Sequence, residues 1–221
     1  MIPPLLCVSL PGSDRRTRLA ARLGAHHVPF SFVNAVREGS PEEALYRSPR
    51  LAHDKHVACF ISHLRAVRQF YETHAPWGLI GEDDLVLHKE FGPRYESVMR
   101  NVPDGTPLVT FCAMVEDWSN SPWAGRDPGQ KNLVRIDPDK LWGTVLYGLS
   151  HEYAGRALER FDRSFDALPL VTSEVIVRQS EGLLSYPLLA IEEGLDSDRG
   201  DPAALPYHRA HFEAWGLEHY G

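Results

Sequence analysis

The segment WGLIGEDD, residues 77–84, decides the fold that we expect, because a short apolar run ends there in three consecutive acids. An apolar run of this length is typical of a buried strand. Carboxylates at its end repel one another unless a positive charge lies among them, and hard divalent cations take oxygen ligands of this kind. If the strand geometry continues, Glu82 and Asp84 point one way and Asp83 the other. Glu82 and Asp84 are then the natural metal pair, and Asp83 faces a ligand hydroxyl or a backbone amide. The alternative interpretation is a solvated loop whose acids lie in water or cap the next element.

Outward from this segment, apolar strands alternate with helices. Strands are expected at 5–10, 28–36, 77–81, 108–115, 142–149 and 186–191, and helices at 14–23, 57–71, 150–161 and just after 172–173. This alternation argues for a single α/β domain with a mainly parallel sheet flanked by helices on both faces. In such sheets ligands bind at the carboxyl ends of the strands, where the three acids lie. Residues 40–54 and 117–139 are expected to be loops.

The helix expected at 57–71 has an apolar stripe at helical spacing, made by Val57, Phe60, Ile61, Leu64, Val67 and Tyr71. Ser62 is expected to project away from this stripe and His63 to lie at its edge. His63 then hydrogen-bonds the acids or a ligand, or only ties the helix to the acidic loop. His56, Cys59 and His63 also fall at spacings of three and four on one flank, which is a pattern that can bind zinc. A small buried cysteine is the alternative interpretation of Cys59.

Composition and charge exclude several classes of protein. The 221 residues carry a formal net charge of -7, which argues against nucleic acid as the main partner. The three cysteines are odd in number and widely spaced, so a disulfide framework is not expected and a reducing, cytoplasmic location is. Neither a signal peptide nor an apolar run long enough to span a membrane is visible.

Four segments, taken together, resemble glycosyltransferase family 25, which includes lipooligosaccharide and procollagen galactosyltransferases. They are VSLP at 8–11 with DRR at 14–16, VPF to NAV between 28 and 36, ACFISHL at 58–64 followed by LIGEDD at 79–84, and GTVLYGLS at 143–150. The resemblance implies a GT-A-type, Rossmann-like fold, a UDP-hexose donor, Mn²⁺ or Mg²⁺, and inversion at the anomeric carbon. The chain departs from the family at Ser9, Gly81 and Glu174, where the family usually has Asn, Leu and Asp.

The resemblance also implies roles for individual residues. Around the donor it places Leu10, Arg15, Arg16, His63 and Asp83. A helix N-terminus with guanidinium groups suits a diphosphate, although Arg15 and Arg16 are also typical of a solvated helix face. Glu174 is the candidate base that deprotonates the acceptor hydroxyl, and its alternative role is a favourable charge in a first helical turn.

The C-terminal part of the chain is expected to complete the metal site. Asp198 or His208 would add a ligand to Glu82 and Asp84, so we divide the chain into a catalytic domain, 1–200, and a tail, 201–221, that packs on or near the site. Each of the two late residues also fits an ordinary polar surface position. Trp118 and Trp123 would stack on the acceptor or anchor their loop.

The resemblance, together with the acids at 82–84, therefore implies an inverting, metal-dependent glycosyltransferase. It would move a hexose, galactose or glucose, from a UDP-sugar to a hydroxyl of a saccharide or of a hydroxylysine-type acceptor. The alternative is a catalytically inactive module that binds sugar or nucleotide on the same fold.

Overall fold

The computed structural model describes residues 1–44, 54–112, 132–139, 141, 143–161, 174–193 and 219–220, without the side chains of 54–56, 132 and 174. Within these ranges no helix is long and apolar enough to cross a membrane. The elements, in chain order, are β1 (Leu5–Ser9), α1 (Asp14–Ala25), β2 (Phe30–Asn34), α2 (Pro41–Ala44), α3 (Asp54–Tyr71), β3 (Trp77–Glu82), β4 (Leu85–Leu87), α4 (Phe91–Met99), β5 (Leu108–Thr110), β6 (Asn132–Arg135), β7 (Leu146–Ser150), α5 (His151–Phe161), α6 (Glu174–Arg178), β8 (Leu183–Tyr186) and β9 (Ala190–Glu192).

The central sheet has seven strands in the order β2-β1-β3-β7-β5-β8-β6. β1 pairs in parallel with β2 and β3, and β5 pairs in parallel with β8. β7 is antiparallel to both of its neighbours, β3 and β5, and β6 is antiparallel to β8. Five strands therefore share one direction and two oppose it, which confirms the predicted mainly parallel sheet. β4 and β9 form a separate antiparallel pair.

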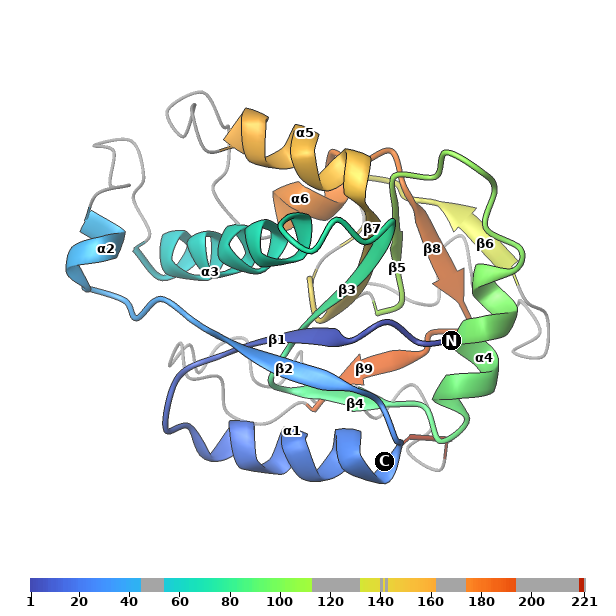
Figure 1. The fold of residues 1–221 in the computed structure, drawn as a ribbon, viewed down its shortest axis with the longest axis horizontal. Coiled ribbons are helices and arrows are strands. Elements are labelled where there is room, and N and C mark those ends of the chain that lie inside the picture. The colour runs from blue at the N-terminus through green and yellow to red at the C-terminus, as the bar shows by residue number, and fades with distance from the viewer. Residues whose placement is uncertain are drawn as a thin grey trace.

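Helices cover both faces of the sheet, as Figure 1 shows, with α3, α5 and α6 on one face and α1 and α4 on the other. The alternation of side chains along the strands explains this arrangement. In β1, Leu6 and Val8 belong to the cluster under α3 and α5, whereas Leu5 and Cys7 belong to the cluster under α1 and α4. A parallel sheet buried in this way requires strands that are apolar on both sides, and β1 is buried along its whole length.

Serine side chains cap the N-termini of two helices. Ser13 is the N-cap of α1, and its side chain accepts a hydrogen bond from the N–H of Arg15 at 3.2 Å. Ser150 plays the same part for α5, where its Oγ accepts the N–H of Tyr153 at 3.1 Å. Each cap satisfies an N–H that the first turn leaves without a partner. The cap of α1 matters most here, because it fixes the helix that follows β1 and carries two candidate donor-binding arginines.

Several elements differ from the prediction. Residues 186–191 were expected to form one strand, but the chain ends β8 at Tyr186 and starts β9 at Ala190, so the two segments belong to different sheets. α2, β4, α4 and β6 were not predicted. α2 lies inside the segment 40–54 and β6 inside the segment 117–139, both of which were expected to be loops. Three- and four-residue strands give too short a pattern for periodicity to detect.

Close packing between β5 and β8 depends on Gly182. A Cβ at this position would lie 2.4 Å from the carbonyl oxygen of Leu108, a backbone atom that cannot move aside cheaply. Gly182→Ala should therefore lower the free energy of unfolding by about 2–3 kcal/mol in urea denaturation. Gly24→Ala in α1 is the matched control, because no atom lies within 4 Å of its added methyl group. It should raise stability by about 0.5–1 kcal/mol, and equal effects of the two variants would contradict the packing argument.

The described end of the chain, His219 and Tyr220, packs beside His88, which follows β4. Tyr220 forms a β-bridge with His88, the rings of His88 and His219 stack with centroids 6.1 Å apart, and Lys89 N–H donates to the His219 carbonyl. The rest of the predicted tail, 201–218 and 221, lies outside the described residues. Its proximity to the candidate site therefore stays a prediction.

The pH dependence of stability should contain a contribution from His88. Burial, and then the charge of Arg94, lower the pKa of His88 from 6.5 to about 4. Between pH 6.5 and about pH 4, His88 is therefore largely protonated in the unfolded chain and largely neutral in the folded chain. The free energy of unfolding should therefore fall as the pH is lowered from 6.5 toward 4, by about 1–3 kcal/mol from this residue. Urea denaturation at several pH values should show a flatter profile for His88→Asn, whereas the exposed His74→Asn should keep the wild-type slope.

Candidate active site

The three predicted acids lie at the carboxyl ends of β1 and β3, and they do not continue the strand. β3 ends at Glu82, and Asp83 and Asp84 form a turn before β4. The alternation expected from an uninterrupted strand is therefore wrong. Asp83 and Asp84 face the same partner, while Glu82 turns toward α3. β9 brings a fourth carboxylate, because Glu192 pairs with Leu85 in the β4–β9 ladder. We call Glu82, Asp83, Asp84 and Glu192 the acidic corner.

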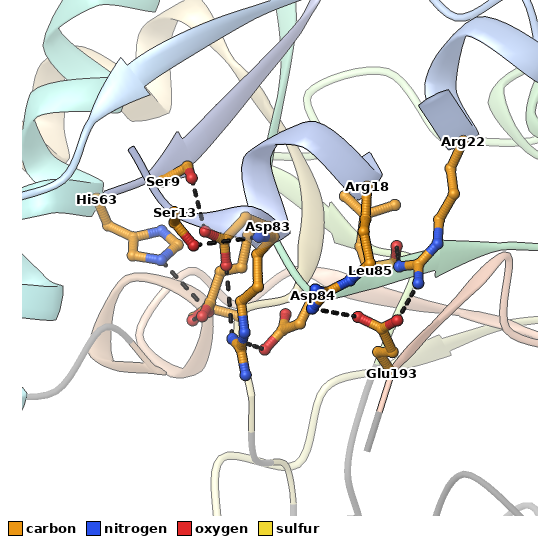
Figure 2. A network of polar contacts seen from close by, with 12 residues as sticks. Ser9, Ser13, Arg18, Arg22, His63, Asp83, Asp84, Leu85 and Glu193 are labelled. Atoms are coloured by element: carbon orange, nitrogen blue, oxygen red, sulfur yellow. Dashed lines mark hydrogen bonds and ion pairs between the residues drawn. The ribbon is translucent and has the colours of Figure 1, made fainter. Parts of the chain in front are cut away.

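Arg15 of α1 is held between the two aspartates of the turn. Its Nη1 lies 3.5 Å from Asp83 Oδ1 and 3.2 Å from Asp84 Oδ2. All three side chains are only 11% exposed. Ser9, at the end of β1, donates its hydroxyl to Asp83 Oδ2 at 2.6 Å. Asp83 therefore has both a hydroxyl donor and a guanidinium beside it, and Figure 2 shows the contact between Ser9 and Asp83. The donor-binding role expected for Arg15 stays a prediction.

Glu82 is held by a different set of groups. Thr144 donates its hydroxyl to Glu82 Oε1, and His63 Nε2 lies 3.4 Å from the same oxygen. The other ring nitrogen of His63, Nδ1, is 3.1 Å from the Tyr147 hydroxyl. Burial by itself lowers the pKa of His63, yet this pKa is raised overall because Tyr147, Cys59 and Glu82 surround the ring. His63 is fully buried, so it contacts Glu82 of the acidic corner from the interior of the protein.

The acidic corner carries more negative than positive charge. Burial is the first cause that raises the pKa of the Asp84 carboxyl well above its usual range, and the charges of Glu192, Glu82 and Asp83 act in the same direction. The charge of Arg15 lowers the pKa of Asp84, but by less than burial and the other acids raise it. Asp84 Oδ1 is buried and has no hydrogen-bond partner among the described residues. Three further carboxylates and one guanidinium act on the charge of Asp84, which also has an unsatisfied buried oxygen; such a set has the chemistry of a site for a divalent cation.

A second ion-pair network, made by Arg18, Arg22 and Glu193, holds the turn at Asp83 and Asp84 in place. Arg22 of α1 donates to the Leu85 carbonyl at 3.3 Å and pairs with Glu193, which also lies 3.7 Å from Arg18. The N–H of Glu193 donates to the Asp84 carbonyl at 2.8 Å. Figure 2 shows this network on the side of Asp84 opposite His63. It holds the acidic turn against α1, so the corner is largely preorganised.

The other predicted donor-binding residues lie nearby but contact different groups. Arg16 donates to the Ser9 carbonyl at 3.2 Å and to Asn34 Oδ1 at 2.9 Å, and its guanidinium lies over the Phe32 ring. Leu10 is half-buried in the turn after β1. Their positions beside the N-terminus of α1 are compatible with the predicted role, which stays a prediction.

Some predicted site residues fall outside the described structure. These are Asp198, His208, Trp118 and Trp123, together with the side chains of Glu174 and His56. The backbone of Glu174 is the first residue of α6. Their roles stay predictions.

Glu192 is the site residue that sequence reasoning missed. The signal was present, because Glu192 directly follows an apolar run within the strand expected at 186–191, just as Glu82 follows its own strand. What the sequence did not indicate is that β9 pairs with β4, which places Glu192 against Asp84.

Sequence comparisons identify related proteins. The profile of glycosyltransferase family 25, described as an LPS biosynthesis protein family, matches residues 2–140. The lacto-N-neotetraose biosynthesis glycosyltransferase LgtB of Neisseria gonorrhoeae is 26% identical over 167 residues, which cover 67% of this chain and 57% of that protein. LgtE of Neisseria meningitidis serogroup B is 25% identical over 176 residues, with the same two coverages. The chain thus spans less than two thirds of the length of these relatives.

A comparison with solved structures concerns the fold alone. The crystal structure of A197 from STIV superposes with a TM-score of 0.50 at 12% identity, covering 90% of this chain and 87% of that one. A glycosyltransferase involved in glycosylating the major capsid of PBCV-1 gives a TM-score of 0.38 at 11% identity, covering 79% and 74% of the two chains.

Proposed function

Because the chain belongs to glycosyltransferase family 25, we propose that it transfers a hexose, galactose or glucose, from a UDP-sugar to a hydroxyl group of a saccharide. The transfer would require a divalent cation, Mn²⁺ or Mg²⁺, and invert the anomeric carbon. The names of the Neisseria relatives support glycosyl transfer in the synthesis of a saccharide. The identity of the transferred sugar, the acceptor, the cation and the inversion are proposed here for this chain.

The observation that carries the proposal is the charge of the acidic corner. Asp84 Oδ1 is buried and has no hydrogen-bond partner among the described residues, while other acids raise the pKa of its carboxyl. A fold does not retain such an arrangement without cost, because each buried carboxylate must be paired or protonated. A divalent cation would relieve the repulsion. The expected ligands are therefore Glu82 and Asp84, with Glu192 close to Asp84 as a further candidate.

The residues of this chain would act mainly by positioning and charge. A bound divalent cation would supply positive charge for the diphosphate that leaves the sugar. Ser9 and Arg15 would hold Asp83 in place, and Thr144 and His63 would hold Glu82. The N-terminus of α1, with its capped first turn, offers N–H groups to an anionic donor. Glu174 would take the proton of the acceptor hydroxyl.

The test is a panel of nucleotide sugars, assayed by thermal shift with and without Mn²⁺ and then for transfer to a saccharide. UDP-galactose or UDP-glucose should raise the melting temperature only with Mn²⁺, because the ligand binds the folded state. Transfer should follow and disappear with EDTA. Binding without turnover, unaffected by Glu174→Gln, would instead support the inactive module. If no nucleotide sugar binds with any divalent cation, the proposal fails.

A further inference from the structure

A second cluster of metal-binding side chains lies on the inner side of the acidic corner. Cys59, His63 and Glu82 each offer one ligand atom, and these atoms lie within 4.8 Å of one another. Cys59 and His63 are four residues apart on α3, so their side chains share one face of the helix. Glu82 reaches this face from the end of β3. Three ligand types that favour zinc therefore meet between a helix and a strand that are far apart in sequence.

The state of His63 is an independent sign that a ligand belongs there. The ring is fully buried, and Nε2 has no hydrogen-bond partner among the described residues, although it lies 3.4 Å from Glu82 Oε1. Nδ1 is already engaged by the Tyr147 hydroxyl at 3.1 Å. The nitrogen that faces Cys59 and Glu82 is therefore the one left to bind a metal. A buried nitrogen without a hydrogen bond is costly, and a coordinated ion would remove that cost.

Two of the three ligands also have the supporting partners that metal ligands usually have. Metal-binding imidazoles typically hydrogen-bond through their second nitrogen, and metal-binding carboxylates accept further hydrogen bonds. Tyr147 supports His63 in this way, and Thr144 donates to Glu82. Both residues belong to the segment 143–150, so one stretch of chain orients both side chains.

We propose that Cys59, His63 and Glu82 bind a zinc ion, with a fourth position open to water. Binding would release the Cys59 thiol proton, and any proton on Nε2 of His63, to water, while the ring keeps one proton on Nδ1, facing the Tyr147 hydroxyl. A thiolate sulfur, a neutral imidazole nitrogen and a carboxylate oxygen would then coordinate the ion. The ion would link α3 to the end of β3 and fix the Glu82 side chain. The site goes beyond the proposed function, which concerns the cation on Glu82 and Asp84.

Ligand chemistry separates the two sites, although they share Glu82. A thiolate and an imidazole favour zinc, whereas a set made only of carboxylates favours manganese or magnesium. The zinc site should therefore survive the loss of Asp84 and fail with the loss of Cys59, and the cation on the acidic corner should behave in the opposite way.

The test uses the full chain, depleted of metal with a chelator and titrated with Zn²⁺ under a competing indicator. We expect one zinc per chain, and with Co²⁺ we expect the near-ultraviolet absorption of a thiolate-bound ion. Cys59→Ser and His63→Gln should each weaken zinc binding by at least about 100-fold, since loss of a supporting partner alone costs about 10–100-fold. Tyr147→Phe should weaken it by about 10-fold.

Two controls make the outcome decisive. Asp84→Asn should retain zinc and lose the Mn²⁺-dependent binding of donor, which separates this proposal from the proposed function. His74→Asn removes an exposed histidine just after α3 and should leave the zinc affinity unchanged. Circular dichroism would confirm that each variant is folded. Absence of a zinc equivalent in the folded wild type, or undiminished zinc and cobalt binding in Cys59→Ser, would overturn the proposal.

Discussion

Asp84→Asn should lower kcat/KM for sugar transfer by about 10³-fold, or about 4 kcal/mol of transition-state stabilisation. The amide removes the negative charge that a divalent cation would need, at an acid whose pKa is raised by burial and by Glu192, Glu82 and Asp83. The shape of the side chain is retained, so packing should not change. The measurement is initial rates with saturating Mn²⁺, for wild type and variant, on the donor found in the nucleotide-sugar panel.

Stability distinguishes this effect from misfolding. Because burial and neighbouring acids raise the pKa of Asp84, the folded state disfavours its charged form. The metal-free variant should therefore melt at the same temperature as wild type or at a higher one. Asp104→Asn, at an exposed acid in a turn, is the matched control and should retain full activity. Wild-type kcat/KM for Asp84→Asn at saturating Mn²⁺ would contradict the role that we give to Asp84.

Arg15→Met should reduce the free energy of unfolding by about 2–4 kcal/mol near neutral pH. The guanidinium lies 3.5 Å and 3.2 Å from the two aspartates, and the three side chains are nearly buried. Removing one member of a buried ion pair leaves charges without compensation, which is strongly destabilising. Protonation of a carboxylate limits the loss, so the deficit should shrink as the pH is lowered. Urea denaturation at pH 7.5 and pH 5 measures both effects.

The same variant tests whether the corner accepts a cation. If Mn²⁺ binds the carboxylates, it should stabilise Arg15→Met more than wild type, because it replaces positive charge that the variant has lost. Arg18→Met is the matched control, since Arg18 is 42% exposed and lies 3.7 Å from Glu193. We expect at most about 1 kcal/mol, because Arg18 is exposed and Glu193 keeps Arg22 as a partner in the variant. Identical stabilities of the two variants would show that Arg15 is not a buried counter-ion.

The fold was predictable where long elements carry a regular pattern. The helix α3 and the strands β1 and β3 bury most of the apolar residues that the sequence singled out, but Trp77 is half-buried and Tyr71 is 37% exposed. Ser62 shows why periodicity was not sufficient. It was expected to project away from the core, but it is 1% exposed and its Oγ accepts the N–H of Val36 at 2.8 Å. α3 is covered on several sides, so its polar positions are buried as well.

The candidate site was predictable in its location and less so in its internal pairing. An apolar strand followed by acids correctly places Glu82 and its neighbours at the carboxyl edge of the sheet. The expected alternation of the three acidic side chains ends at Glu82, because Asp83 and Asp84 form a turn and β4 leaves the main sheet to pair with β9. Long-range pairing of two three-residue strands has no local signal, so Glu192 could not be assigned to this site from its own segment.

The position of β7 has a consequence for how much of the chain is needed to make a stable unit. The family profile ends at residue 140, yet β7 starts at Leu146 and joins β3 to β5. A fragment cut at the end of the matched region would leave two central strands with open edges, and such edges recruit other chains into aggregates. During synthesis on the ribosome, the half of the sheet made first would likewise stay unclosed until the later segment emerged.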